Sequence, residues 1–560
     1  MAVFLPVRVE HRRQTGAQWM SAAGERNGLA RQTNVEDRDR ARVRSGRQWV
    51  LSLFSCATLV FAVLAYGAAE RWALSVVEAV VFLGCGVALI VHRQRLASVL
   101  RLKEMIPLGL FAALLLLQMT PLPQPVVGWL SPNTLQLYHE ARFQALAEGG
   151  TGLQGAVQED WTAPWVSLSI DRLRTLEWTL LFLAVWGLFV LVLVDPVLRF
   201  EHLILVLCGL GLFNVLVFFV QIIGDGTYIW MESMAPWGSY LGTFKSPNNF
   251  AEFLETVVPL SLGLILCRYA AARSAGAASE RADGEVRRSS SRAEPRRHRS
   301  YFDYWHWRNW SHRSARRRRP RLVQGIVTAY ARQALLFFAT IFMVVAILFS
   351  SSRASIITIP VMAIAFVACM GLIEGRFYRG ALLWIAGLLL LALVYVEWIG
   401  AAPLIRTLER LFAHGATSAR PMNLGLAWRM AADFPLFGVG FNNWPTIVLR
   451  YHTMVGREQW YPGVAYNDML QVLAETGILG LGCLATFVGM IYHRAVAALR
   501  SKAGPATHAK ILIVAGLAAM TAPLIHSLLD YVFYLPSQAL VFMAIAASVY
   551  RLSVTTEREQ

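Results

Sequence analysis

Long uninterrupted apolar runs are the feature of this sequence that most constrains its fold. The hydrocarbon layer of a bilayer is about 30 Å thick, and a helix needs about 20 apolar residues to cross it. Hydrophobic residues make up 56% of the 560 residues and charged residues only 16%, and many of the hydrophobic residues fall in runs of this length. A backbone in hydrocarbon must satisfy its own hydrogen bonds, so such runs predict helices. We therefore predict an all-α, polytopic transmembrane helical bundle.

Twelve apolar runs can be placed along the chain, although the seventh and eighth, which meet at Ser350–Ser352, are also compatible with one long kinked segment. The predicted spans are, in chain order, 48–68, 72–92, 105–122, 174–194, 199–223, 248–268, 331–351, 354–373, 379–399, 468–492, 510–529 and 534–550. The predicted organisation is a disordered basic tail over 1–47, spans one to six over 48–268 with a loop over 123–173, a basic and disordered loop over 269–330, spans seven to nine over 331–399, a large loop over 400–467, spans ten to twelve over 468–550, and a tail over 551–560.

Lysine and arginine in the connections predict the orientation, because basic loops of inner-membrane proteins stay in the cytoplasm. An even number of spans puts all the strongly basic connections on one side. These are the N-terminal tail and the loops over 93–104, 269–330 and 493–510. Residues 268–321 alone contain sixteen arginines and five acidic residues. We therefore predict a multi-pass protein of the bacterial inner membrane with both termini cytoplasmic and with the loops over 123–173, 224–247 and 400–467 in the periplasm.

The net charge of +17 does not require a nucleic-acid partner. An arginine-rich segment interleaved with Trp305, Trp307 and Trp310 could bind RNA, but beside a membrane it fits topology and anionic lipid headgroups better. The six cysteines lie in or at the edges of apolar runs without paired spacing, which is typical of packing residues. The sequence shows no phosphate-binding glycine loop, zinc motif or serine nucleophile elbow. We expect membrane lipids as partners, and no nucleic acid, metal or cofactor.

The large loop over 400–467 contains more arginine than an outward-facing loop needs. Guanidinium groups bind phosphate oxygens bidentately, so these side chains suit the diphosphate of a lipid-linked donor. The alternative is that they face solvent, pair with acidic residues or extend to lipid headgroups. The arginines are Arg406, Arg410, Arg420, Arg429, Arg450 and Arg457.

Several sequence blocks between about Pro121 and Pro536 resemble the O-antigen ligase and polymerase superfamily. The two main blocks are Asp433-Phe-Pro-Leu-Phe-Gly-Val-Gly-Phe441 and Tyr466-Asn-Asp-Met-Leu-Gln-Val-Leu-Ala-Glu-Thr-Gly-Ile-Leu-Gly480. Three further similar blocks are Gly242-Thr-Phe-Lys-Ser-Pro-Asn-Asn-Phe-Ala251, Ser350-Ser-Ser-Arg-Ala354 and His526-Ser-Leu-Leu-Asp530. A large outward loop between the ninth and tenth spans agrees with this resemblance.

The resemblance implies a metal-independent, inverting glycosyltransferase that works on the periplasmic face. Members move a glycan from an undecaprenyl diphosphate carrier to an acceptor sugar, either on lipid A core in a ligase or on another carrier-linked repeat in a polymerase. The donor already carries a good leaving group, so the protein mainly positions the reactants and stabilises the departing diphosphate. The expected roles are surface polysaccharide or lipopolysaccharide biosynthesis.

The resemblance also implies cationic site residues. Arg353 matches the family's Ser-Arg position, and Arg420 matches an arginine upstream of the Asp-x-Pro element. Both are candidate clamps for the donor diphosphate, and Lys245 is a third. The alternatives are an interfacial anchor for the arginines and extension to the headgroups for the lysine.

The sequence departs from the family at the residue expected to activate the acceptor. Where the family motif begins with His-Asn, this chain has Tyr466-Asn467. A tyrosine of pKa near 10 would cost about 4 kcal/mol more than histidine as a base at neutral pH. Tyr466 and Asn467 therefore remain candidates for orienting the acceptor, and Glu475 in the same motif for a catalytic or a positioning role. The candidate alternative bases are His414, His452 and His526.

A second hypothesis is a non-catalytic or transport protein on the same scaffold. The missing motif histidine favours it. A transporter is expected to have broken helices at mid-membrane and an internal repeat. The sequence contains no evident repeat, and a phosphorylated lipid better explains the arginine-rich loop.

Overall fold

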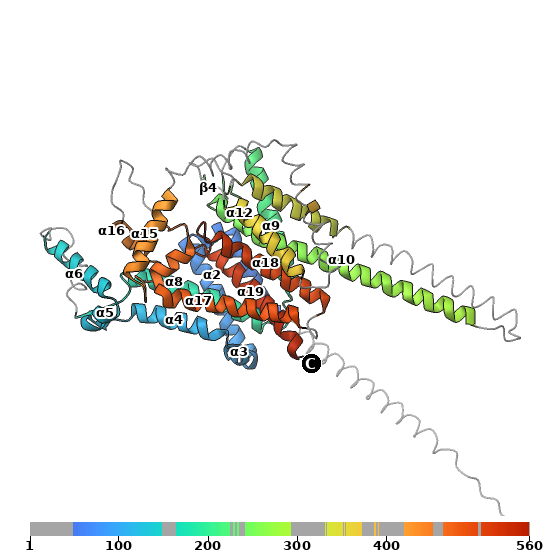
Figure 1. The fold of residues 1–560 in the computed structure, drawn as a ribbon, viewed down its shortest axis with the longest axis horizontal. Coiled ribbons are helices and arrows are strands. Elements are labelled where there is room, and N and C mark those ends of the chain that lie inside the picture. Colours follow the sequence, from blue (N-terminus) through green and yellow to red (C-terminus); the bar gives the residue numbers. More distant parts are fainter. Residues whose placement is uncertain are drawn as a thin grey trace, which may run out of the picture.

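The computed structural model describes residues 49–147, 164–224, 228–229, 232–233, 241–292, 331, 333–350, 352, 354–371, 386–387, 390, 419–451, 463–501 and 506–558. These residues form an almost entirely helical structure, as the sequence predicts (Figure 1). The strands are two-residue pairs: β1 (Leu122–Pro123) pairs antiparallel with β2 (Trp165–Val166), and β3 (Tyr228–Ile229) with β4 (Glu232–Ser233).

Seven helices in the described residues are long and apolar enough to cross a membrane. They are α2 (Arg71–Val91), α8 (Arg172–Val194), α9 (Phe200–Ile223), the part of α10 over Pro247–Ala271, α17 (Asp468–Arg500), α18 (Thr507–His526) and the part of α19 over Pro536–Val554. Four shorter apolar helices are Trp49–Leu64, α4 (Met105–Met119), Gln333–Phe349 and the part of α12 (Ser355–Met370) over Ile357–Met370. Together these helices coincide with eleven of the predicted spans. The ninth, 379–399, lies largely outside the described residues, so the count of twelve stays a prediction.

One expectation about the basic loop is wrong at its beginning. Helix α10 (Pro247–Arg292) continues well past residue 268, into a segment predicted to be disordered. Residues 269–292 contain seven alanines and five arginines, which have high helix propensity and favour the continuation of the helix. The rest of the predicted loop lies outside the described residues.

The centre of the bundle is built around α10, whose residues 249–267 are all buried. Small residues allow its neighbours to approach closely, as is usual between membrane helices. A Cβ added at Gly263 would lie 2.3 Å from the Cβ of Ala515 in α18, and one at Gly516 would lie 2.2 Å from Val549 in α19. These small residues therefore let α18 lie close to both α10 and α19.

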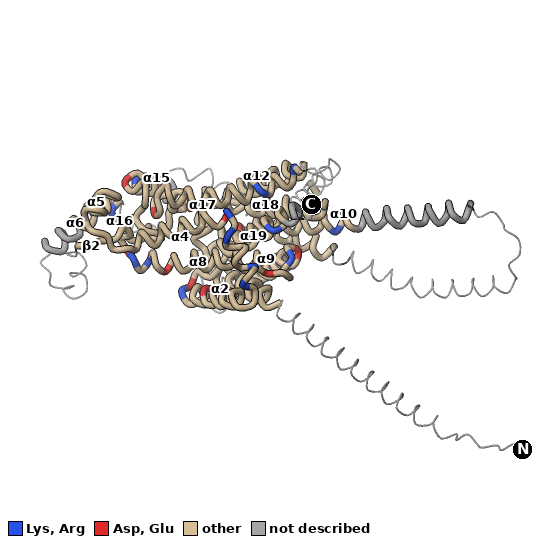
Figure 2. The backbone as a smooth tube through the Cα atoms, turned by 90° about the horizontal axis from the view of Figure 1, so that it is seen from below, with Lys and Arg blue, Asp and Glu red and all other residues tan. Residues whose placement is uncertain are grey.

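Four short helices form a layer at one end of the bundle, which we call the cap. They are α5 (Gln124–Leu130), α6 (Pro132–Ala147), α15 (Ala419–Asp433) and α16 (Trp444–Tyr451). The cap has its own apolar core, which includes Met430, Phe434 and Trp444. Figures 1 and 2 show these helices together at one end, while α10 leaves the bundle at the other. The cap therefore covers the end where α4 finishes and where α8 and α17 begin.

Candidate functional site

The two main motif blocks, separated by 24 residues in the sequence, pack directly on each other. The segment 434–443, here called the motif loop, lies on the first half of α17. Its backbone is joined to α17 by hydrogen bonds from Val439 N to Ala474 O (3.1 Å) and from Gly440 N to Glu475 O (3.0 Å). Gly438 and Gly477, both with positive φ, allow this contact: a Cβ at either one would lie 2.1 Å from backbone atoms of the other segment. The glycines of both motifs are therefore required by the packing.

Glu475 fixes the end of the motif loop. Its side chain is 0% exposed, and both carboxylate oxygens accept hydrogen bonds. The backbone N–H of Asn442 donates to Oε2 (2.8 Å) and that of Trp444 to Oε1 (3.0 Å). The Gln471 amide and the Tyr534 hydroxyl also donate to this carboxylate. These contacts hold the motif loop against α17; none of these four partners is an arginine, and a catalytic role for Glu475 stays a prediction.

Gln118, near the end of α4, binds the same loop from the opposite side. Its amide nitrogen donates to the carbonyl oxygens of Phe437 (2.6 Å) and Glu475 (2.9 Å), and its amide oxygen accepts from Phe441 N (3.1 Å). Gln118 is not among the site residues predicted from the sequence. The one sequence feature that marks it is a single amide side chain near the end of an otherwise apolar helix.

The beginning of α17 is tied to the connection between α18 and α19. Asn467 is the N-cap of α17, with Oδ1 accepting from Leu470 N (2.9 Å), and its amide nitrogen donates to Leu528 O (2.9 Å). Tyr466 just before it has φ 57°, and its half-buried ring meets the Tyr531 ring edge-on at 5.9 Å. A non-glycine residue in left-handed backbone is uncommon and is often found at functional sites.

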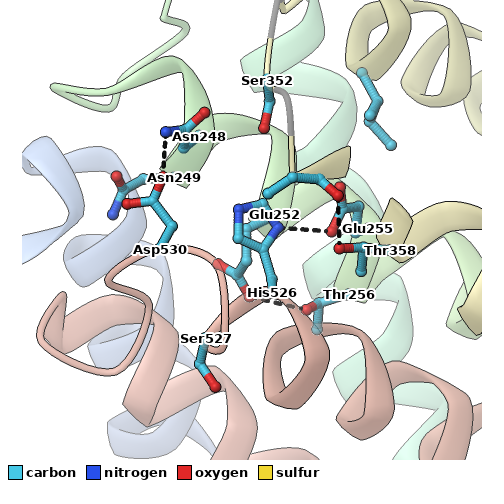
Figure 3. A network of polar contacts seen from close by, with 12 residues as sticks. Asn248, Asn249, Glu252, Glu255, Thr256, Ser352, Thr358, His526, Ser527 and Asp530 are labelled. Atoms are coloured by element: carbon cyan, nitrogen blue, oxygen red, sulfur yellow. Dashed lines mark hydrogen bonds and ion pairs between the residues drawn. The ribbon is translucent and has the colours of Figure 1, made fainter. Parts of the chain in front are cut away.

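Polar side chains from α10, the end of α18, the connection after it and the segment before α12 converge inside the bundle close to this point (Figure 3). We call this set the polar cluster; its members are Asn248, Asn249, Glu252, Glu255, Thr256, Ser352, His526 and Asp530. His526 Nδ1 and Glu255 Oε2 form a hydrogen bond at 3.0 Å, and Thr256 donates to Glu252 at 3.2 Å. Asn248 donates to Asp530, and this hydrogen bond joins the Gly242–Ala251 block to the His526–Asp530 block.

Several groups in the polar cluster keep unused hydrogen-bonding capacity. Both amide atoms of Asn249, Glu252 Oε2 and the Ser352 hydroxyl have no partner among the described residues. Buried polar groups are nearly always hydrogen-bonded, so this concentration suits the binding of a polar group. No three His, Cys, Asp or Glu side chains in the described part of the chain are grouped as metal ligands.

The structure locates some of the predicted cationic residues. Lys245 pairs with the Glu70 carboxylate and lies 5.4 Å from the centre of the Tyr66 ring, so its charge is already engaged. Arg420 is in the first turn of α15 on the cap, but its side chain is outside the described part. Arg353, His414 and His452 also lie outside the described residues. The arginine clamp therefore stays a prediction.

His526 is described and lies in the polar cluster. Its ring is 0% exposed, and its Nδ1 is in hydrogen-bond contact with Glu255, which orients the ring. Its burial inside the bundle separates it from the motif loop, so its role as an alternative base stays a prediction.

Comparison with known families agrees with the motif blocks. Residues 338–485 match the family model described as O-Antigen ligase. The matched region contains the Ser350–Ala354 block, the motif loop and the first half of α17. No curated protein matches the chain. The resemblance noted in the sequence is thereby confirmed over residues 338–485, which match the O-antigen ligase family, in a chain with several helices long and apolar enough to cross a membrane.

Proposed function

We propose that the protein is a glycosyltransferase of the ligase or polymerase type that transfers a glycan from an undecaprenyl diphosphate carrier to an acceptor sugar on the periplasmic face of the inner membrane. One observation carries this proposal: the two family motifs pack together under the cap, with the polar cluster beside them. We call the site formed by the motif loop and residues 466–477 the mouth. A fold that only crossed the membrane would not need Gly438, Gly477 and Glu475 to hold a polar loop at this place.

A lipid-linked substrate fits the surroundings of this mouth. An apolar cavity of about 480 Å³ lies between α4, α8, α17, α18 and α19. Phe441 of the motif loop, Asp468 and Tyr534 also line it. A substrate with an apolar chain and a polar head matches a cavity of this composition beside a polar mouth. This arrangement supports a lipid carrier better than a soluble sugar nucleotide.

The arginines complete the proposed site. Arg353 directly follows Ser352, which belongs to the polar cluster, and Arg420 begins the cap helix α15. Two guanidinium groups would neutralise the diphosphate as it departs, so no metal ion or nucleotide is needed. In a single displacement, the acceptor oxygen attacks opposite the leaving diphosphate, and the configuration at the anomeric carbon inverts.

The first experiment is deletion of the gene and gel analysis of the surface polysaccharides. Loss of polymer from lipid A core is expected for a ligase, and collapse of a polymer to single repeats is expected for a polymerase. Complementation by the wild-type gene is the control. An unchanged polysaccharide pattern with altered uptake of a solute would overturn the transferase proposal in favour of a transport protein.

The second experiment uses purified protein in proteoliposomes. Mixing it with a lipid-diphosphate-linked glycan and an acceptor glycan should release lipid diphosphate in proportion to the glycan transferred. Product formation that requires the protein supports the proposal, and the anomeric configuration of the product tests inversion. Absence of transfer with every donor and acceptor pair drawn from the host's own surface polymers would overturn it.

A further inference from the structure

The proposed transfer needs a group that takes the proton of the acceptor hydroxyl, and the motif position that would supply it is Tyr466. Histidine has an ordinary pKa near 6.5 and tyrosine near 10, so tyrosine is a poor base at neutral pH. The inference developed here rests on the proposed function and concerns which residue fills this role.

Asp468, the first residue of α17, is two positions after Tyr466 and is 1% exposed. Its Oδ2 accepts two backbone hydrogen bonds, from Val532 N (2.8 Å) and Phe533 N (2.6 Å). Its backbone N–H donates to Ser527 O (2.9 Å). One carboxylate oxygen is therefore held rigidly, and the position of the whole side chain is determined.

The other oxygen of Asp468 is unused. Oδ1 is buried and accepts no hydrogen bond from any residue that the structure describes. The side chain lines the apolar cavity together with Phe441 and Tyr534. A buried carboxylate oxygen without a donor is costly, and such a group is usually kept for binding or chemistry.

Asp468 and Tyr466 share the same side of the mouth. The Tyr466 ring contacts Tyr531, and the Asp468 carboxylate binds the next two backbone N–H groups, those of Val532 and Phe533. A proton acceptor at either position would therefore serve nearly the same region of the mouth. This proximity allows one residue to replace the other.

The other acidic and basic groups of the site are less suitable. Both oxygens of Glu475 are occupied by the motif loop, Gln471 and Tyr534. His526 is 0% exposed inside the bundle and does not line the cavity. Asp468 alone among these combines a fixed orientation, an unused oxygen and a place on the cavity wall.

We propose that Asp468 is the general base of this protein. It takes the role of the histidine that the family motif has where this chain has Tyr466. Oδ1 takes the proton of the acceptor hydroxyl while the hydroxyl oxygen forms a bond to the anomeric carbon of the donor. The bond between this carbon and the diphosphate oxygen breaks, and its electron pair leaves with the diphosphate. Tyr466 then has an orienting role beside the base.

The test begins with Asp468→Asn in the proteoliposome assay. The amide oxygen of asparagine can still accept from Val532 N and Phe533 N, but the amide nitrogen cannot take a proton. We expect kcat to fall by about 10²-fold to 10⁴-fold, which is the usual contribution of general-base catalysis, and KM for the donor to change by less than about threefold. The matched control is Asp171→Asn at the N-cap of α8, where asparagine is an equally good cap, and we expect unchanged activity.

A double variant separates a base from a structural residue. Adding Tyr466→His to Asp468→Asn should restore at least about tenfold of the lost kcat, because histidine supplies a base at the neighbouring position. If Tyr466→His restores none of the lost kcat, the role of Asp468 is to hold the backbone of Val532 and Phe533, and the proposal is overturned. Wild-type kcat in Asp468→Asn would overturn it as well. These outcomes differ from failure of the proposed function, in which the wild-type protein itself transfers no glycan.

Discussion

The contact between the two motifs depends on Gly477, and its replacement by alanine tests the packing directly. Gly477 has φ 65° and ψ −173° inside α17, a backbone conformation that is essentially restricted to glycine. An added Cβ would also lie 2.1 Å from Leu436 O and 2.2 Å from Leu436 C, which are backbone atoms of the motif loop. Both effects oppose the substitution.

The expected cost follows from these two effects. A non-glycine residue in such a backbone region costs about 1–3 kcal/mol. Displacing packed neighbours for one extra methyl group costs about 1–3 kcal/mol more. The clash is with backbone, which cannot change rotamer, so relaxation would have to move the motif loop itself. We therefore expect Gly477→Ala to lower the free energy of unfolding by about 2–6 kcal/mol and to abolish most glycan transfer.

The assay is the apparent melting temperature of the purified protein in one detergent, followed by its activity. The matched control is Gly482→Ala, five residues further along α17, where an added Cβ would meet no atom within 4 Å. Alanine there should be neutral or stabilising by up to about 1 kcal/mol. We expect Gly477→Ala to melt at least about 4 °C below wild type. Equal melting temperatures and activities in the two variants would refute the role of Gly477 in joining the motifs.

Three further predictions concern the mouth and the topology. Tyr466→Phe should reduce turnover substantially, because only the orienting hydroxyl is lost, and Tyr466→His should keep or raise it; a silent Phe variant with an inactive His variant would mean that the motif marks fold alone. Replacing Arg353 or Arg420 by Lys should lower donor turnover at least tenfold while membrane insertion stays intact, because a point charge cannot reproduce a bidentate fork; full turnover in both Lys variants would remove them from the site. A reporter fused within 274–315 should report cytoplasm and one within 412–418 periplasm, and the same answer from both would contradict the predicted orientation.

The membrane helices were predictable because their signal is local. A run of about 20 apolar residues indicates a span without any knowledge of its neighbours. The exact ends were harder to predict. The first helix ends at Leu64, and the next residues include Tyr66 and Ala68, both with positive φ. Neither residue type favours left-handed backbone, so the turn is imposed by packing, with Leu535 beside Gly67.

The cap was predicted only as two loops, over 123–173 and 400–467. Its helices are short, and their burial depends on contacts between those loops. Asn133 donates to the Asp433 carbonyl oxygen, and Arg450 pairs with Glu140. Each contact joins residues about three hundred positions apart, and a single sequence contains no signal for such pairs. The motif resemblance identified the residues of the mouth, while their partners emerged only from the fold.

The hydrogen bonds of the mouth separate groups that build it from groups that can act in it. Glu475, Gln118 and Asn467 have their polar atoms engaged in hydrogen bonds, each with at least one backbone group of another segment, so their contribution is to hold the motif loop and α17 in place. Asp468 and Asn249 are as deeply buried but keep polar atoms that no described residue binds. Glu475 and Asn467 belong to the motif blocks quoted from the sequence, whereas Gln118 lies outside them. The unpartnered atoms of the second set cost stability, and under the proposed function a substrate group meets them during transfer.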